Sequence, residues 1–180
     1  MGAVVSVEFV LDASSDAAVR REWVLLEAAG LPSQARHAGM SNRPHLTLLV
    51  RTALRDLPGA ALHHRLPIEV TLGAPVLFGG GRTRVLARSV VPTASLLECH
   101  EAVHALAGPG DDAPHTKPGE WTPHVTLARR LPLDRIGEAL AVLADDGVEP
   151  IAAHAVGLRR WDAASKTVSH LAGRGTLEPC

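Results

Sequence analysis

Aromatic side chains are scarce in this sequence. Its 180 residues contain no tyrosine, two phenylalanines and three tryptophans, and aromatic residues make up 3% of the chain against 46% for all hydrophobic residues. A chain with this balance builds its core from aliphatic side chains, which makes Trp23, Trp121 and Trp161 notable positions. A chain of this length can bury about 70% of the surface that its unfolded form exposes, so a substantial core is expected.

Cysteine is also scarce, and the sequence has neither an excess of one charge nor long apolar runs. Cys99 and Cys180 are the two cysteines, which excludes a framework of several disulfides and fits a reducing compartment. The net charge of −1 argues against a protein that coats duplex nucleic acid, although it allows a local basic site. No window approaches eighteen apolar residues and the N-terminus lacks a basic segment, so we expect a cytoplasmic protein without a membrane partner. We also expect a monomer.

The chain divides into two halves in which the predicted elements follow the same order. The glycines of Gly79–Gly81 cannot hold regular structure cheaply, and they separate the halves. Apolar periodicity and capping residues predict strand, helix, strand, helix and strand on either side. The predicted segments are 4–11, 15–29, 45–50, 54–64 and 68–77 in one half, and 84–91, 95–107, a strand from 124, 133–144 and 151–160 in the other, with a last arm at 166–172. We therefore expect one α+β domain over 1–180, with pseudo-repeat halves of about 1–78 and 82–172.

A short motif occurs once in each half. Pro44–Leu48 reads PHLTL and Pro123–Leu127 reads PHVTL, and their histidines are 79 positions apart (124 − 45). Such a match arises by chance often enough that repetition alone proves little. The two histidines, however, follow Gly30 and Gly108, where the first helix of each half is expected to end, by 15 and 16 residues (45 − 30 and 124 − 108). This equivalent placement indicates that the motif occurs twice because the fold itself consists of two repeated halves.

The motif gives each strand one polar face. Side chains alternate along a strand, so His45 and Thr47 share a face, as do His124 and Thr126. A single copy would be explained as a polar surface stripe, because threonine favours strands and histidine tolerates partial burial. Two copies that converge about a twofold axis would supply a base, an acid and two hydroxyl donors, which suits attack on a phosphodiester without a metal or cofactor. The sequence does not distinguish the acid from the base.

Paired H-x-T-hydrophobic motifs about 80 residues apart, here PHLTL and PHVTLAR, resemble the 2H phosphoesterase superfamily. The resemblance is to its LigT-like RNA 2′,3′-cyclic phosphodiesterases, also called 2′-5′ RNA ligases, and it covers most of the chain. It implies a bilobal fold of duplicated β-α-β-α-β units, with antiparallel sheets around a central cleft. It also implies metal-independent hydrolysis of 2′,3′-cyclic phosphate ends of RNA or nucleotides to 2′-phosphates, with 2′-5′ ligation in some members. On this resemblance His45 and His124 are the acid and base, and Thr47 and Thr126 hold the phosphate.

Further residues are candidates for substrate binding. Arg129 matches a phosphate-contacting position in the family that the chain resembles, whereas strict alternation along the strand would bring Arg130 onto the His124 face. Arg43 could also line the cleft. Family members often have a phenylalanine after the first motif, which this chain lacks, and Trp121 is therefore a candidate for stacking on a base.

Two alternatives remain open from the sequence. His100, Glu101 and His104 spell H-E-x-x-H, the pattern of a zinc-dependent hydrolase, on a predicted helix. Helical phase places His100 beside the buried stripe and His104 nearer solvent, and no third ligand follows at a familiar spacing, which favours an ordinary surface helix. The other alternative is a protein that binds nucleotides or RNA ends without catalysis, although binding alone needs no acid and base pair.

Overall fold

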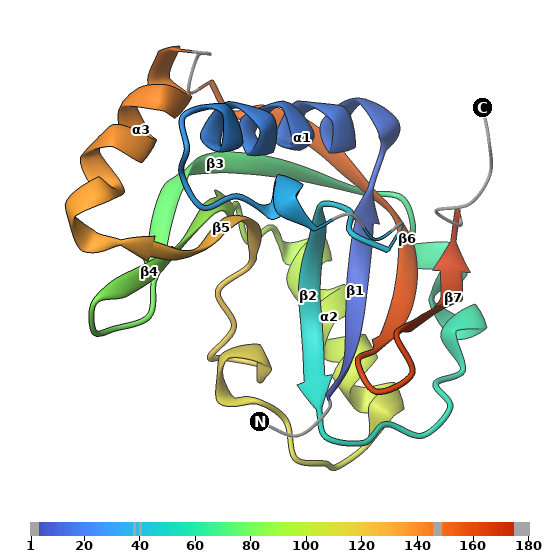
Figure 1. Cartoon of the computed structure of the whole chain (residues 1–180). Helices are drawn as coiled ribbons and strands as arrows, with labels where there is room; N and C mark the ends of the chain where they lie inside the picture. The colour runs from blue at the N-terminus through green and yellow to red at the C-terminus, as the bar shows by residue number, and fades with distance from the viewer. Residues whose placement is uncertain (1–3, 38, 40, 146–148, 175–180) are drawn as a thin grey trace.

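A computed structural model of the chain describes residues 4–37, 39, 41–145 and 149–174. Over these residues the fold combines seven strands with three α-helices and four short 3-10 helices (Figure 1). The strands are β1 (Val5–Leu11), β2 (His45–Arg51), β3 (Ile68–Phe78), β4 (Thr83–Val90), β5 (His124–Pro132), β6 (Ile151–Asp162) and β7 (Thr167–Gly173). The helices are α1 (Ala13–Ala28), α2 (Ala94–Ala107) and α3 (Ile136–Asp145), with 3-10 segments η1 (Gln34–Arg36), η2 (Gly59–Arg65), η3 (Pro114–Thr116) and η4 (Leu133–Arg135). The predicted α+β fold with antiparallel strands is confirmed.

The strand pairing repeats between the two halves of the chain. The sheet has the order β1-β2-β5-β4-β3-β6-β7, and an additional pairing of β1 with β6 closes the first six strands into a ring. Exchanging β1 with β4, β2 with β5 and β3 with β6 leaves this ring of pairings unchanged. The β2–β5 and β3–β6 pairings therefore lie on a pseudo-twofold axis, because each joins two strands that the exchange interchanges.

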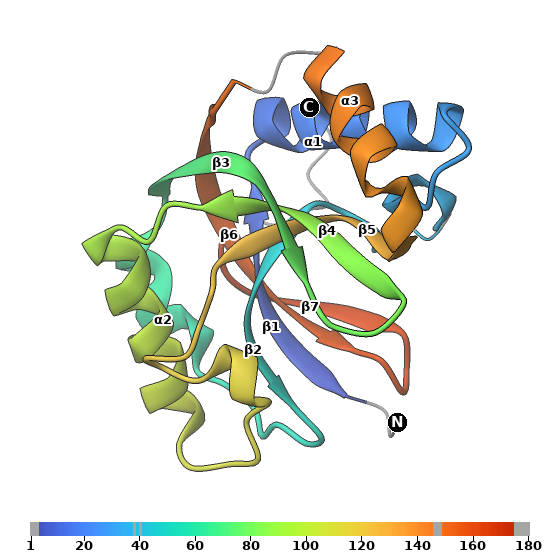
Figure 2. The ribbon, with the colours of Figure 1, turned by 90° about the vertical axis from the view of Figure 1, so that its left-hand side faces the viewer.

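Helices cover the sheet from two sides (Figure 2). α1 and α3 lie together over one part of the sheet, and α2 lies on another side. The core between these layers is aliphatic, with side chains such as Leu26, Leu46, Leu86 and Leu127 fully buried. A buried ion pair joins α1 to β4, in which the Arg88 Nε donates to a carboxylate oxygen of Glu22 at 2.9 Å. No helix among the residues described is long and apolar enough to cross a membrane.

The observed elements differ from the sequence predictions at the segment 54–64 and, by one residue, at the start of α2, which was predicted at residue 95. The segment 54–64 was expected to be a helix, but only Gly59–Arg65 is helical and it is a 3-10 helix. α2 begins after Thr93, whose hydroxyl accepts a hydrogen bond from the Leu96 amide. The predicted break at Gly79–Gly81 forms the turn between β3 and β4, where Gly79 and Gly81 adopt φ angles of 87° and 74° that favour glycine.

Candidate active site

One pair of residues joins β2 to β5 and brings the two motifs together. Leu46 lies opposite Val125 in an antiparallel pairing, and both side chains are fully buried. These residues occupy the same position in the two motifs, one place after the histidine. Because side chains alternate, the histidines and threonines of both strands lie on the opposite face, and all four are partly exposed. They are His45, Thr47, His124 and Thr126. In a regular antiparallel ladder the two histidines would be diagonal neighbours, with about 7–8 Å between their Cα atoms.

Each histidine is oriented in the same way by its own strand. The Nδ1 atom of His45 lies 2.6 Å from the carbonyl oxygen of Arg43, and that of His124 lies 2.8 Å from the carbonyl oxygen of Thr122. A carbonyl oxygen only accepts hydrogen bonds, so each Nδ1 carries a proton and donates. Nε2 is consequently the nitrogen that can exchange a proton with a substrate on this face.

His124 lies in surroundings that favour its neutral form. The ring of Phe78 packs against it with 4.5 Å between ring centroids. Burial lowers the pKa of His124 below its ordinary value of 6.5, and the charges of His115, His45 and Arg129 lower this pKa further. The hydrogen bond to the Thr122 carbonyl acts in the opposite direction but does not outweigh these effects.

His45 has a buried carboxylate as its neighbour. The Oε1 atom of Glu8 lies 3.7 Å from the His45 Nε2 atom, and the His45 side chain is 23% exposed. The same carboxylate accepts hydrogen bonds from the Ser6 hydroxyl at 2.6 Å and from the Arg159 Nε at 2.8 Å. Burial by itself would raise the pKa of Glu8, but the charges of His45 and Arg159 and these hydrogen bonds lower it overall. Glu8 is therefore an anion beside His45.

β5 does not follow the strict alternation on which the sequence prediction for its arginines depended. Two shifts in its pairing with β4 each insert one extra residue into β5, and Arg130 adopts a left-handed φ of 58°. Arg129 is close enough to His124 for its charge to lower the pKa of that histidine. The geometry therefore gives no reason to prefer Arg130, and the role of either arginine as a substrate ligand stays a prediction.

The other two candidates for substrate binding are engaged within the protein. Arg43 forms an ion pair with Asp16 of α1, with 3.0 Å between its Nε atom and the carboxylate. The Trp121 ring stacks on His100 with 4.0 Å between centroids, and its Nε1 donates to the Thr47 carbonyl at 2.9 Å. Trp121 thus has a packing role next to the site. Stacking on a base, which could use only its other face, stays a prediction.

The H-E-x-x-H segment of α2 is part of the packing behind β2. His100 and His104 are both buried, which corrects the prediction that His104 lies nearer solvent, whereas Glu101 is exposed. Their Nε2 atoms lie 3.0 and 3.1 Å from the carbonyl oxygen of Leu48, and His100 also lies 2.9 Å from that of Thr116. Within the described part of the chain, no group of three or more His, Cys, Asp or Glu side chains is arranged to hold a metal ion.

Both histidines satisfy the carbonyl oxygen of Leu48, which the strand pairing leaves without a partner. The β1–β2 pairing skips Leu48, since Val7 lies opposite Leu49 and Glu8 opposite Thr47. Leu48 is therefore left out of the β1–β2 ladder. It is also fully buried, so water does not reach it. A buried carbonyl oxygen without a partner is costly, and the two imidazole N–H groups satisfy it.

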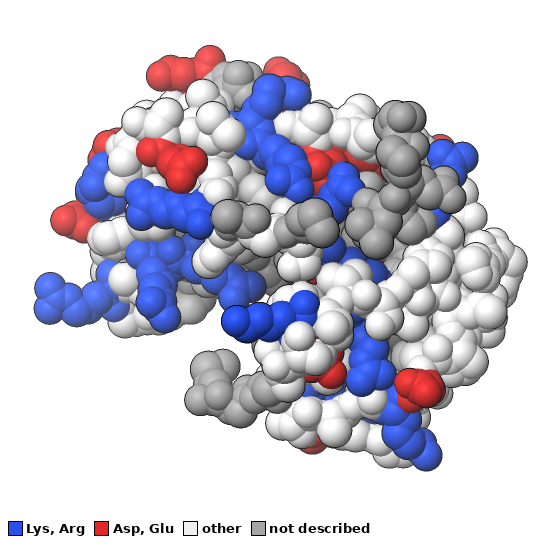
Figure 3. Space-filling model, turned by 45° about the vertical axis from the view of Figure 1, so that its right-hand side comes forward, with Lys and Arg blue, Asp and Glu red and all other residues white. Residues whose placement is uncertain are grey.

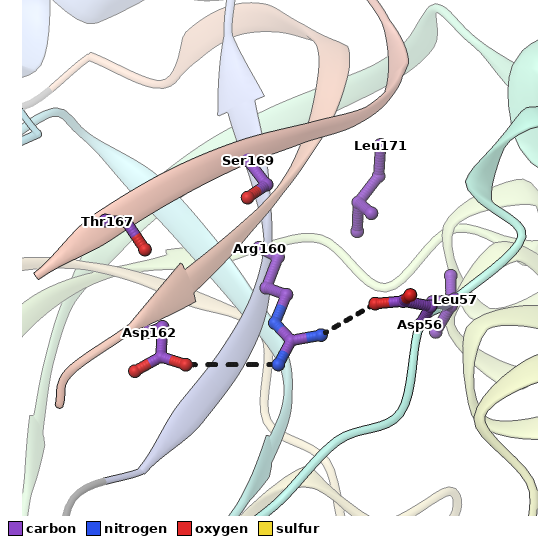
Figure 4. Close-up of a pocket in the computed structure, with 7 residues that line it drawn as sticks. All are labelled: Asp56, Leu57, Arg160, Asp162, Thr167, Ser169 and Leu171. Atoms are coloured by element: carbon purple, nitrogen blue, oxygen red, sulfur yellow. Dashed lines mark ion pairs between the residues drawn. The ribbon is translucent and has the colours of Figure 1, made fainter. Parts of the chain in front are cut away.

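An open hollow is lined by residues other than the histidine pair (Figure 4). It has a volume of about 360 Å³ and is lined by residues of β6, β7 and the segment before η2. Arg160 points between two carboxylates in it, at 3.8 Å from Asp56 and 3.9 Å from Asp162. Its charged side chains are paired with one another, and no histidine or cysteine lines it. We therefore assign the chemistry to the face shared by β2 and β5.

Basic side chains gather near this face. Figure 3 shows Lys and Arg side chains grouped on the lobe that contains the β3–β4 hairpin, beside an indentation of the surface. β4 and β5 contain four arginines and no Asp or Glu, and of these Arg88 is buried with Glu22. A locally basic site on a chain whose net charge is −1 is suited to phosphate.

Glu8, Arg159 and Phe78 were not identified from the sequence as site residues. The sequence did give an indication for Glu8, since it is the one charged residue in the strand VSVEFVL. Arg159 and Phe78 gave none, because their contacts with the histidines depend on how distant strands pair.

Comparisons with known proteins agree with this geometry. The family model described as the 2'-5' RNA ligase superfamily matches residues 42–172. The solved structure of Kluyveromyces marxianus Usb1 is similar with a TM-score of 0.50 and 10% identity, over 93% of this chain and 97% of that chain. The same protein solved with uridine monophosphate gives 0.52 and 12% identity, again over 93% and 97%. Comparison with curated proteins finds no match. The structural likeness establishes a shared fold. Because the family model covers most of this chain, the chain belongs to the 2'-5' RNA ligase superfamily.

Proposed function

We propose that this protein is a metal-independent phosphodiesterase that opens 2′,3′-cyclic phosphates at the ends of RNA or on nucleotides. The product would carry a 2′-phosphate and a free 3′-hydroxyl. The observation that carries the proposal is the pairing of Leu46 with Val125, which puts the two histidine motifs side by side on one accessible face. Family membership and the structural likeness to a protein solved with uridine monophosphate support a nucleotide or RNA substrate.

The reaction needs two proton transfers, and His45 and His124 can supply both. One imidazole takes a proton from water as the water oxygen attacks phosphorus. The bond between phosphorus and the 3′ oxygen then breaks, and the other imidazole gives its proton to that oxygen. The hydroxyls of Thr47 and Thr126 would donate to the non-bridging oxygens, on which negative charge accumulates. Each proton transfer contributes about 10²–10⁴-fold, so the pair accounts for a large acceleration without a metal.

The test is hydrolysis of 2′,3′-cyclic nucleotides and of a short RNA ending in a cyclic phosphate, in the presence of EDTA. Wild type is expected to turn over at least one of these substrates, and His45→Ala and His124→Ala are each expected to lose about 10²-fold or more. His154→Ala is a suitable control, since that exposed histidine of β6 lies outside the site.

Each alternative predicts a different result. Activity that disappears with EDTA in wild type would support a metal-dependent hydrolase instead. Binding of the RNA end with no turnover by well-folded wild type would support a binding protein without catalysis. Incubation of the cyclic-phosphate RNA with a 5′-hydroxyl RNA would reveal 2′-5′ ligation, in which the 5′-hydroxyl oxygen takes the place of water, attacks the same phosphorus and displaces the 3′ oxygen.

A further inference from the structure

Two of the three tryptophans of the chain hold the main chain of the two motifs. The Trp121 Nε1 donates to the main-chain carbonyl oxygen of Thr47 at 2.9 Å. The Trp23 Nε1 donates to that of Thr126 at 3.0 Å. Thr47 and Thr126 occupy the same position in the two motifs, two residues after the histidine. The same atom of each motif is therefore held by an indole N–H group.

The two tryptophans come from different places in the fold. Trp23 lies on α1, whereas Trp121 lies in the segment that leads into β5. Neither has a tryptophan as its counterpart in the other half, because α2 and the segment before β2 contain none. A buried indole N–H group usually finds a partner, so one such bond would need no functional explanation. The repeat of the fold does not explain two bonds to equivalent atoms from non-equivalent places, whereas a shared requirement of the two motifs does.

The two motif strands restrain each other at a single point. Within the described residues, β2 and β5 pair only where Leu46 lies opposite Val125. On their outer edges, β2 pairs with β1 and β5 pairs with β4 along most of their lengths. Because β2 and β5 are antiparallel, Thr47 and Thr126 lie on opposite sides of their one contact. Each indole thus restrains one motif strand beyond the point where the opposite strand does so.

Both indole rings are themselves fixed by their surroundings. Trp23 is 3% exposed, and the guanidinium of Arg20 lies 5.5 Å from the centre of its ring. The Trp121 ring lies within 5° of parallel to that of buried His100, with 4.0 Å between the ring centres. A donor on a fixed ring sets the position of the oxygen that it binds. The backbone of each threonine therefore has little freedom to move.

We propose that Trp23 and Trp121 are positioning residues, which hold the backbone of the two threonines so that their hydroxyl groups stay in place. In this role they act through Thr126 and Thr47, and not on the substrate. Hydroxyl donors contribute most when they are already in place as negative charge builds on the non-bridging oxygens. A misplacement of about 1 Å can lower a rate about 10²-fold. The inference rests on the proposed function, and it adds what keeps the phosphate donors in position.

The first test removes each indole N–H group and keeps an aromatic ring, in Trp23→Phe and Trp121→Phe. With a 2′,3′-cyclic nucleotide, each variant is expected to lower kcat and kcat/KM together by about 10–10²-fold, because the threonines act on the transition state. Trp161→Phe, at the tryptophan of β6 that holds neither threonine, is the matched control and should stay close to wild type. Melting temperatures identify an assay temperature at which every variant is folded. Full activity in both variants would overturn the inference.

Double-mutant cycles separate positioning from a general loss of structure. If Trp121 acts through Thr47, then Trp121→Phe should have little further effect in Thr47→Val and its full effect in Thr126→Val. The reverse should hold for Trp23→Phe. Equal effects of each tryptophan variant in the two valine backgrounds would show that the tryptophans only support the fold, which would overturn the inference.

A readout without turnover distinguishes this inference from the proposed function. In HNCO spectra, the carbonyl ¹³C resonance of Thr47 is expected to move in Trp121→Phe, and that of Thr126 in Trp23→Phe. If these resonances move but wild type hydrolyses none of the substrates, the proposed function is overturned and the anchoring of the threonines is supported. Resonances that stay in place in both variants would overturn the inference even for an active enzyme.

Discussion

The hydroxyl groups of Thr47 and Thr126 lie beside the two histidines, one on each strand of the shared face. Threonine is common on strands, so their presence alone is not evidence of function. Their equivalence across the Leu46–Val125 pairing is the stronger argument, because it places two hydroxyl donors at matching positions on one face.

Thr47→Val and Thr126→Val each remove one hydroxyl without changing the shape of the side chain much. Each is expected to lower kcat for the cyclic phosphate by about 10²–10³-fold, the usual effect of removing one donor to a developing negative charge. Steady-state kinetics at neutral pH would measure this. Thr47→Ser and Thr126→Ser keep the donor and should stay much closer to wild type. Full activity in both valine variants would exclude the threonines as phosphate ligands.

At the scale of elements, α2 supports β2 through a pair of buried imidazoles. His100 connects the carbonyl oxygens of Leu48 and Thr116, and its ring stacks on Trp121. Trp121 in turn donates to the Thr47 carbonyl. The H-E-x-x-H sequence thus serves to hold the irregular part of β2 directly behind the candidate site.

His100→Leu is expected to reduce the free energy of unfolding by about 1–3 kcal/mol, because it removes hydrogen bonds to two carbonyl oxygens. Urea denaturation monitored by tryptophan fluorescence would measure the loss. Glu101→Gln, at the exposed position of the same pattern, should change stability by less than about 0.5 kcal/mol. If the pair instead held a metal, EDTA would destabilise wild type by a similar amount and leave His100→Leu unaffected.

At the scale of the whole molecule, several buried or hydrogen-bonded groups make stability depend on pH. Burial first, and then the charge of His104, lower the pKa of His100 below 6.5, and the pKa of His124 is also lowered. For Glu8 and Asp112, burial would raise the pKa, but partners that include Arg159 and Arg51 lower it. The folded state therefore binds fewer protons than the unfolded state, both near pH 6 and near pH 4.

The free energy of unfolding is consequently expected to have its full value above about pH 6.5 and to decrease in two stages on acidification. The first stage begins below the ordinary histidine pKa of 6.5, and the second begins below the ordinary Glu value of 4.5. Melting temperatures measured from pH 8 to pH 3 would reveal both stages. His100→Gln should flatten the first stage specifically. A melting temperature that rises on acidification from pH 7 to pH 5 would contradict the expectation.

Much of the architecture could be predicted because it depends on local patterns. Alternating and helical spacing of apolar residues predicted most strands and helices to within a few residues, and Gly79–Gly81 marked the hairpin between halves. Residues 54–58 were wrongly assigned to a helix, since the observed η2 begins only at Gly59. The polar face of His45 and Thr47 followed from strand alternation alone.

The sequence by itself determined which side chains carry the proposed chemistry and that each pair shares one face of its strand, because alternation is a property of the local backbone. Only the tertiary structure decided that Leu46 meets Val125, that a bulge interrupts β5 near Arg129, and that the Glu8 carboxylate lies beside His45. Those contacts join segments far apart in the chain. They depend on how the whole sheet closes and how the helices pack on it, and no local pattern contains that information.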